Sequence, residues 1–207
     1  MKKLVLFFLF ITASVSAQFK VDYENVKVSF EQVYKVDSLT ALSIHKRANE
    51  WIALNFNNSK NVIRLDSGSK IIVKGMFQIT TDIQGHFVDA PIYFDMITEF
   101  KEGKYRLSFV DYVVKTQGVS SSIEGHAYID SFENHKEQIE KLQSNTTDPY
   151  LKRYYKKLLN SEDELRKMYK NGLDASRVVL AAVERETVSL ANSLYRYILA
   201  PENTGDW

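Results

Sequence analysis

Side chains follow a period of two within two neighbouring stretches of the chain, residues 90–100 and 104–115, with one apolar face and one mixed face. In the first stretch one face carries Ile92, Phe94, Met96, Thr98 and Phe100, and the other carries Tyr93, Asp95, Ile97 and Glu99. In the second, Tyr105, Leu107 and Phe109 alternate with Arg106, Ser108 and Val110. Because successive side chains of a strand point to opposite faces, and Lys101-Glu102-Gly103-Lys104 forms a turn between the stretches, the pattern predicts an antiparallel hairpin. Its apolar face should pack against a helix or another sheet.

The rest of the first half is predicted to be a sheet with one helix. That helix follows a cap at Asp37 and Ser38 and ends near residue 55, because its apolar residues recur at steps of three and four. They are Ala41, Ile44, Ala48 and Trp51, and they predict a helix that packs by its Trp51 face. The other predicted strands cover 19–36, 62–65, 70–81 and, after a polar loop at 116–122, residues 123–129, with turns at 66–69 and 84–86.

From residue 131 onward the pattern becomes helical with dense mixed charge. Two helices are predicted on either side of a break at 145–149, and a capping box at Ser161 begins a final helix that runs to about residue 199. A seam along this helix steps by three and four through Leu173, Ser176, Leu180, Val183, Thr187, Leu190, Leu194 and Tyr197. The helix would be about 58 Å long. Either it bends at Gly172, or part of the seam meets another helix or another copy of the chain.

The first residues have the anatomy of a secretory signal peptide. Lys2 and Lys3 precede an unbroken apolar run at 4–11, and the chain then turns small and polar up to Ala17. A membrane-spanning helix would need about 20 apolar residues, roughly twice this run. Cleavage between Ala17 and Gln18 is therefore expected, leaving a secreted or periplasmic protein with no transmembrane segment in the mature chain.

Composition narrows the functions that are open to the mature chain. Cysteine is absent, which excludes disulfides and thiolate sites, so stability must come from a packed core. Removing Lys2 and Lys3 from the 27 basic residues leaves 25 against 26 acidic residues. A nearly neutral chain lacks the concentrated positive field that nucleic-acid binding needs, so no nucleic acid is expected as a partner.

One stretch of the first half resembles a known family. The resemblance covers residues 34–112 and rests on Trp51-Ile52-Ala53, Asn55-Phe56, Val62-Ile63 before Asp66 and Gly68, Ile71-Ile72-Val73-Lys74-Gly75, and Phe100 followed by Tyr105-Arg106. These residues resemble an uncharacterised family of secreted Bacteroidota domains with a TATA-binding-protein-like fold, domain of unknown function number forty-four sixty-eight. The resemblance implies an α+β fold with a curved antiparallel β-sheet packed by helices on one face. It implies no activity, and the fold name does not carry DNA binding with it.

Together these observations predict a signal peptide at 1–17, a TBP-like α+β domain at 18–130 and a helical extension at 131–207. The extension ends in one long terminal helix and either packs on the domain or projects from it.

The search for catalytic chemistry finds no motif. None of the four histidines has metal-ligand spacing, and a composite site of His86, Asp89 and His126 would require converging loops. Asp95 and Glu99 lie about 13 Å apart along one strand, too far to act on one bond. No phosphate-binding glycine motif, serine-nucleophile motif or cofactor motif occurs, so neither a cofactor nor an enzyme is predicted.

Aromatic residues offer the best candidate contacts, because they make up 13% of the chain. Tyr93, Tyr112, Tyr154 and Tyr155 are predicted to lie on the outer sheet face or on a helix surface, where amphipathic rings favour protein or glycan contacts. The neighbouring basic cluster of Lys152, Arg153, Lys156 and Lys157 suits either an anionic partner or a solvated helix face.

Three functional hypotheses remain open. The first is an exported, non-catalytic module of the cell envelope that binds a protein, a glycan or an apolar ligand. The second is a structural protein that associates with itself through the terminal helix, whose seam would permit this. The third is an enzyme with an unrecognised loop site built around His86 and His126.

Overall fold

The computed structural model describes residues 18–56, 59–83, 85–116, 119–127 and 131–201. The predicted signal peptide, residues 1–17, lies outside the described residues, which begin directly after the predicted cleavage site at Ala17. The elements are β1 (Gln18–Asp22), β2 (Lys27–Lys35), α1 (Ala41–Asn55), α2 (Ser59–Val62), β3 (Ile63–Asp66), β4 (Lys70–Ile83), β5 (His86–Lys101), β6 (Lys104–Thr116), β7 (Val119–Ser122), α3 (Glu124–Ala127), α4 (Phe132–Asn145), α5 (Pro149–Leu159) and α6 (Glu162–Leu199).

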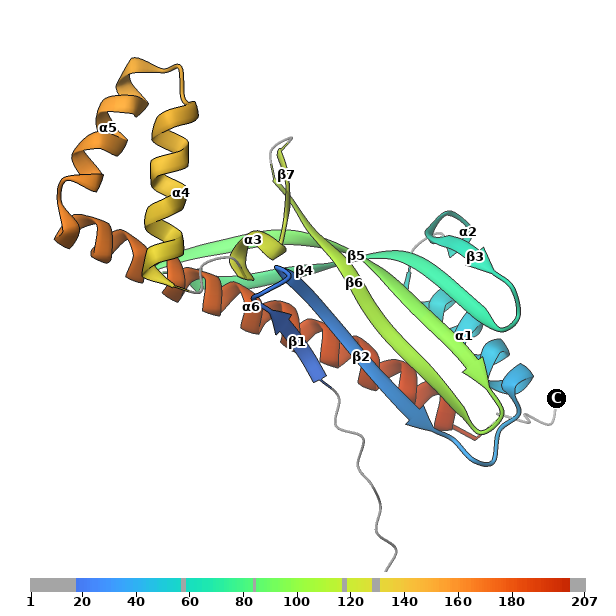
Figure 1. Ribbon diagram of the computed structural model, residues 1–207. Helices are drawn as coiled ribbons and strands as arrows, with labels where there is room; N and C mark the ends of the chain where they lie inside the picture. Colours follow the sequence, from blue (N-terminus) through green and yellow to red (C-terminus); the bar gives the residue numbers. More distant parts are fainter. Residues whose placement is uncertain (1–17, 57–58, 84, 117–118, 128–130, 202–207) are drawn as a thin grey trace, which may run out of the picture.

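The strands form one antiparallel sheet in the order β1-β2-β6-β5-β4-β3, with β7 pairing beside β6. The predicted hairpin is confirmed as β5 and β6, whose turn contains Gly103 at a φ of 67°. Its apolar residues are buried on one face of the sheet, where α1 and α6 lie (Figure 1). The other face is open as far as the described residues extend. The predicted α+β architecture, an antiparallel sheet packed by helices on one face, is therefore confirmed.

Two predictions of a single strand were wrong. In both segments a polar side chain binds nearby backbone N–H groups and favours a turn or a helix start. The single strand predicted over 19–36 is the hairpin of β1 and β2, since the carboxylate of Asp22 accepts hydrogen bonds from the N–H groups of Glu24 and Asn25. The strand predicted over 123–129 is the short helix α3, at whose start the hydroxyl of Ser122 accepts from the N–H of Glu124 at 3.1 Å. Such side-chain bonds favour turns and helix starts over strands.

The N-cap of helix α1 lies two to three residues after the predicted cap at Asp37 and Ser38. The hydroxyl of Thr40, instead of Asp37 or Ser38, accepts a hydrogen bond from the N–H of Ser43 and forms the N-cap. The predicted Trp51 face is buried, and the indole N–H of Trp51 donates to the hydroxyl of Ser193 on α6 at 3.1 Å. This contact holds the two sheet-covering helices together.

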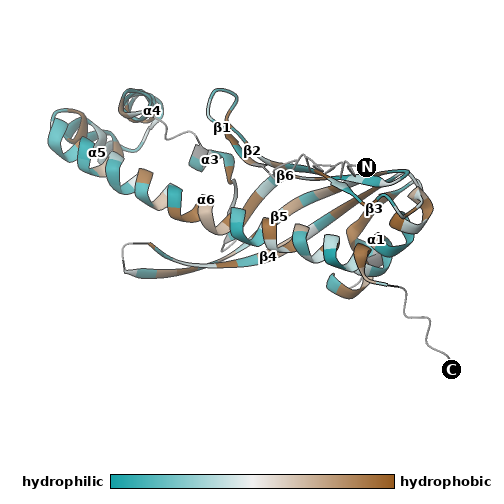
Figure 2. Cartoon of the chain, turned by 90° about the horizontal axis from the view of Figure 1, so that it is seen from below, coloured by the Kyte–Doolittle hydropathy of each residue, from teal (hydrophilic) through white to brown (hydrophobic). Residues whose placement is uncertain are grey.

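Helix α6 is continuous for 38 residues and does not break at Gly172, so it spans about 57 Å. Figure 2 shows it crossing the covered side of the sheet from the arm to the α1 end. The predicted seam meets the chain's own sheet and α1: its buried members from residue 176 onward are Ser176, Leu180, Val183, Thr187 and Leu194. At the far end the guanidinium of Arg47 donates to the carbonyls of Ile198 and Ala200, both at 2.6 Å, and so caps α6.

The first turns of α6 project beyond the sheet together with α4 and α5, forming what we call the arm, residues 132–175 (Figure 1). The arm has a small core of its own, made by the buried residues Ile139, Leu158 and Leu165 with Phe132, Tyr155 and Leu159 packed against them. Both helices predicted around 145–149 are confirmed as α4 and α5, and Ser161 caps α6 as predicted. Among the described helices, none combines the length and hydropathy that a membrane span requires.

Candidate functional site

The structure separates the four candidate tyrosines into two exposed and two packed residues. Tyr93 is 37% exposed on the open sheet face, with the ammonium of Lys115 4.4 Å above its ring, and Tyr154 is 46% exposed on the arm. Tyr155 is partly buried in the arm core. Tyr112 is 1% exposed, so its predicted surface position is wrong.

A β-bulge explains the burial of Tyr112. Asp111 has a φ of 54°, and between the pairs Tyr93–Val113 and Asp95–Val110 strand β6 holds one more residue than β5. One extra residue reverses the alternation of faces. Side chains at 105, 107 and 109 point to the core before the bulge, and Tyr112 points there after it.

The buried residues Thr187 and Ser176 of the α6 seam each lie within hydrogen-bond distance of a polar side chain from another element. The hydroxyl of Tyr112 lies 3.0 Å from that of Thr187, and both residues are buried. Near the other end of the contact, Nδ1 of His126 on α3 lies 3.1 Å from the hydroxyl of Ser176. Burial lowers the pKa of His126 and raises that of Tyr112. These groups therefore fix α6 on the sheet as neutral hydrogen-bonding pairs.

The histidines and acids that were considered for catalysis do not assemble into a metal site. Asp89 accepts a hydrogen bond from the hydroxyl of Thr80 at 2.6 Å, whereas His126 bonds Ser176 on α6. His86 lies at the exposed tip of the β4–β5 hairpin. Over the part of the chain that the structure describes, no group of three or more His, Asp or Glu side chains is arranged to hold a metal ion.

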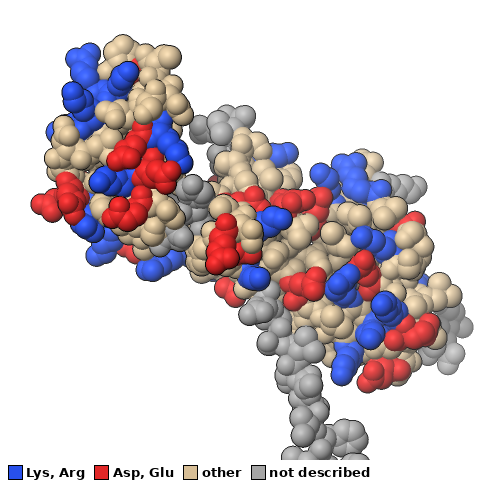
Figure 3. Space-filling view, in the orientation of Figure 1, with Lys and Arg blue, Asp and Glu red and all other residues tan. Residues whose placement is uncertain are grey.

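Asp95 and Glu99 point to the open sheet face, and each has a cationic neighbour. The carboxylate of Asp95 lies 3.7 Å from Nζ of Lys74, and Glu99 accepts from Arg106 and lies 3.6 Å from Nζ of Lys70. The hydrogen bond from Arg106 holds the pKa of Glu99 below its usual value. Figure 3 shows acidic and basic side chains interspersed over this face, so it presents no continuous basic surface.

Two of the arm helices, α4 and α5, begin at N-cap residues that can be recognised in the sequence. Asp148 caps α5 by accepting from the N–H groups of Tyr150 and Leu151, and Pro149 occupies the first turn, where it needs no hydrogen-bond partner. Ser131 caps α4 in the same way by accepting from the N–H of Asn134. These caps determine where each arm helix begins.

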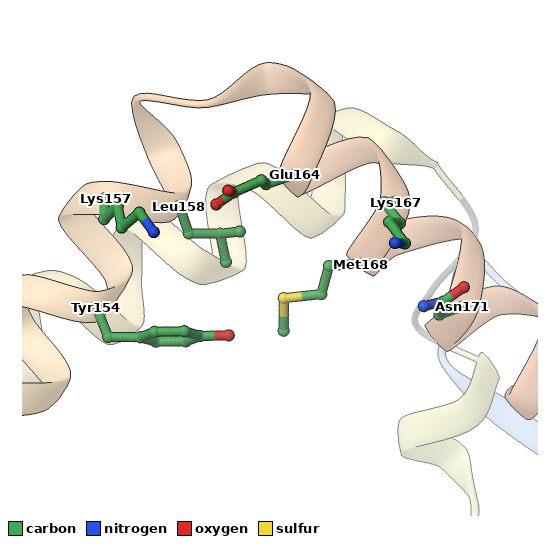
Figure 4. Close-up of a pocket in the computed structure, with 7 residues that line it drawn as sticks. All are labelled: Tyr154, Lys157, Leu158, Glu164, Lys167, Met168 and Asn171. Atoms are coloured by element: carbon green, nitrogen blue, oxygen red, sulfur yellow. The ribbon is translucent and has the colours of Figure 1, made fainter.

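A pocket of about 340 Å³ opens between α5 and α6 (Figure 4). Tyr154 and Met168 point toward one another from the two helices, with Leu158 between them, and polar ends surround this apolar floor. The lining residues are Tyr154, Lys157, Leu158, Glu164, Lys167, Met168 and Asn171. We call this site the arm pocket.

Large apolar side chains remain exposed on the arm, and two of them, Tyr154 and Met168, line the arm pocket. Tyr150, Leu151 and Tyr154 come from α5, Leu142 from α4 and Met168 from α6. Helix α5 also carries four cations, Lys152, Arg153, Lys156 and Lys157, and has no acidic residue within its bounds. Of these four, Lys157 lines the arm pocket, together with Lys167 and Glu164 from α6, so the pocket combines an apolar floor with a rim of net positive charge.

The sequence indicated Tyr154 and Lys157 but not the rest of the arm pocket. Tyr154 and Met168 lie at equal distances along the chain before and after Ser161. Residues so placed on two helices joined by a short turn are brought near each other. Met168 and Lys167 could have been found from this symmetry, but the exposure of Met168 depends on the angle between the helices.

Comparison with known proteins identifies the first half of the chain. Residues 30–115 match the family model described as "Domain of unknown function (DUF4468) with TBP-like fold". The match includes the residues 34–112 on which the sequence resemblance rested. Over residues 30–115 the chain is therefore similar to the DUF4468 family, with the TBP-like fold that the resemblance implied.

Two solved structures match the chain, and the first shows a similar fold. One is a DUF4468 family protein from Bacteroides ovatus, 11% identical, with 93% of this chain and 94% of that chain covered and a TM-score of 0.51. The other is a TBP-like protein from Parabacteroides distasonis, 13% identical, with 82% of this chain and 94% of that chain covered and a TM-score of 0.48. At 11% identity the first likeness shows the fold alone. No curated protein matches the chain.

Proposed function

We propose that this protein is an exported, non-catalytic module of the cell envelope that binds another exported protein through the arm pocket. The observation that carries the proposal is the exposure of large apolar side chains on the arm, beside a pocket rim of net positive charge. Tyr150 is 74% exposed, Leu142 49% and Tyr154 46%. Tyrosine is among the residue types that dominate binding energy at protein interfaces.

Charge decides the kind of partner. Lys157 and Lys167 stand at the arm pocket with one carboxylate, Glu164, and the rest of α5 adds only positive charge. An acidic segment with apolar side chains would fill the floor over Leu158 and Met168 and meet this rim. The occupant that we propose is therefore an acidic, amphipathic segment of another protein.

The two other hypotheses have less support. Self-association through the α6 seam would need the seam to be exposed, but from residue 176 onward its members cover the chain's own sheet. An enzyme around His86 and His126 would need these residues in one site, and His126 instead forms a hydrogen bond with α6. Export is supported by the basic start and apolar run of residues 1–17.

The binding proposal is tested by photocrosslinking in the cells that produce the protein. A photoreactive aromatic residue replaces Tyr154, and the matched control replaces Tyr93, an exposed tyrosine at the open sheet face. We expect a discrete crosslinked protein from position 154 and none from position 93. The crosslink should disappear when Lys156→Glu and Lys157→Glu reverse the basic rim, and mass spectrometry should place it on an acidic segment of the partner.

Three results would contradict binding at the arm pocket: no discrete product from position 154, the same product from both positions, or a product that survives the charge reversal. Circular dichroism of each variant checks that the arm is still folded. Export has its own test. The mature protein, recovered outside the cytoplasm, should begin at Gln18 by mass spectrometry, and a full-length chain retained in the cytoplasm would overturn the export proposal.

A further inference from the structure

A second pocket, of about 460 Å³, opens at the end of the sheet opposite the arm, beside the turn between β5 and β6. Figure 1 shows this turn at the far end of the molecule from α4 and α5. The pocket is lined by Val33, Ser69, Lys70, Glu99, Phe100, Lys101, Lys104, Tyr105 and Arg106. We call it the sheet-end pocket. Its volume lies within the range of roughly 300 to 1,000 Å³ that small-molecule sites occupy.

The charges that line the sheet-end pocket are strongly unequal, with four cations against one carboxylate. That carboxylate, Glu99, is already engaged by two of the cations. Arg106 binds it through Nε at 2.7 Å and through Nη2, and Nζ of Lys70 lies 3.6 Å from it. The side chains of Lys101 and Lys104 form no ion pair or hydrogen bond with any described residue.

The two free lysines belong to a row of three across the open sheet face. Lys35 on β2 pairs in register with Lys104 on β6, which pairs with Lys101 on β5. Like charges that face each other directly across strands destabilise a sheet. In the next row the chain places Glu99 between Arg106 and Lys70, so that neighbouring charges alternate in sign. The lysine row lacks such compensation.

The nearest carboxylates outside the sheet-end pocket are directed to other groups. Glu102, in the turn itself, accepts a hydrogen bond from the N–H of Ala41 at the start of α1. Glu31 accepts from the hydroxyl of Ser108 at 3.3 Å. Asp37 lies against Gly103 and does not line the sheet-end pocket. The ammonium groups of Lys101 and Lys104 therefore remain available to a ligand.

We propose that the sheet-end pocket binds a phosphate or sulfate ester carried on a body of about the size of a sugar. Lys101 and Lys104 bind the oxyanion as two point charges, and Lys70 adds a third cation at the wall. The exposed edge of Val33 and the methylene stems of the lysines contact the body of the ligand. This site is separate from the arm pocket and does not rest on its proposed role.

Titration calorimetry tests the proposal with glucose 6-phosphate, inorganic phosphate and uncharged glucose as probes. Glucose 6-phosphate should bind more tightly than inorganic phosphate, and glucose should not bind. The variant K101Q/K104Q should lose about tenfold in affinity for each lysine removed. The matched control K20Q/K27Q removes two exposed lysines from β1 and β2 of the same sheet and should leave the affinity unchanged.

A second measurement separates a binding role from a structural one. Because K101Q/K104Q relieves like-charge contacts, its urea unfolding midpoint should stay level or rise while its affinity falls. Vesicles of anionic phospholipid serve as a further probe. If the unchanged protein binds vesicles but not glucose 6-phosphate, and K101Q/K104Q loses the binding to vesicles, the ester belongs to a lipid headgroup. If the unchanged protein binds glucose 6-phosphate, the ester belongs to a soluble molecule.

Two results would overturn the proposal. In the first, neither soluble esters nor vesicles bind, although soluble esters at about 10 mM would reveal even a dissociation constant in the millimolar range. In the second, K20Q/K27Q weakens binding as much as K101Q/K104Q, which would mean that only general surface charge attracts the anion.

Discussion

The hydrogen bond between Tyr112 and Thr187 joins the sheet to the long helix at a fully buried position, and its removal gives a sharp test of the packing described above. The two hydroxyl oxygens lie 3.0 Å apart, with Tyr112 1% exposed and Thr187 0% exposed. The substitutions Tyr112→Phe and Thr187→Val each remove one hydroxyl while keeping the shape of the side chain.

The magnitudes follow from what each substitution leaves behind. Thr187→Val leaves the phenol of Tyr112 buried without a partner, which should cost about 1 to 3 kcal/mol of unfolding free energy. Tyr112→Phe should cost less, because the hydroxyl of Thr187 can turn to the carbonyl four residues earlier in α6. The double variant removes both polar groups and should therefore be close to the wild type in unfolding free energy. The coupling should therefore be about 1 kcal/mol or more.

Urea unfolding followed by far-ultraviolet circular dichroism measures all four proteins in the cycle. Equal m-values across them would show that only the native state has changed. If the costs of the two single substitutions simply add in the double variant, the two hydroxyls do not interact. In that case the position of α6 over Tyr112 would be wrong.

Further predictions follow from single buried or strained positions. Gly75→Ala should destabilise the protein by about 1 to 3 kcal/mol in urea unfolding, because a Cβ there would overlap the ring of Phe94 in the core. At the bulge, Asp111→Val should cost about 1 to 2 kcal/mol and Asp111→Gly should be tolerated, because a φ of 54° is difficult for a β-branched residue. His135 is 8% exposed and both ring nitrogens lack a partner among the described residues, so His135→Leu should raise the unfolding free energy by about 1 kcal/mol. Burial lowers the pKa of His135, so the unfolded chain takes up the proton first and stability falls as the pH drops below about 6.5; His135→Leu should reduce that fall, measured by urea titrations at several pH values.

Much of the fold could be predicted because it rests on local patterns. The alternation along β5 and β6, the steps of three and four that bury Trp51, and the caps at Ser161 and Asp148 are each contained within a few residues. These signals agree with the tertiary structure because each buries one face of its own element. The same local evidence failed where a side chain competed with the backbone, as Asp22 does in the turn between β1 and β2.

The candidate site was harder to predict because it depends on contacts between elements. The bulge at Asp111 is one residue whose φ value reverses the faces of β6, and an aspartate gives little sign of it in a sequence read alone. It moved Tyr112 from a predicted surface contact to the core. In the same way, the row of Lys35, Lys104 and Lys101 exists only once the register of three strands is known. The sequence shows the three lysines but not that they are neighbours.

The path of α6 links these findings, because the same helix completes the core at one end and forms part of the arm at the other. A glycine within a helix lowers its stability by about 1 kcal/mol relative to alanine, so Gly172 alone would favour a break where the helix leaves the sheet. The helix nevertheless continues, because it is held on both sides of Gly172: Leu165 is buried in the arm core, and Ser176 is bound by His126 of α3. A continuous helix fixes the direction in which the arm projects. A partner bound at the arm pocket would therefore be held at a fixed position relative to a ligand in the sheet-end pocket.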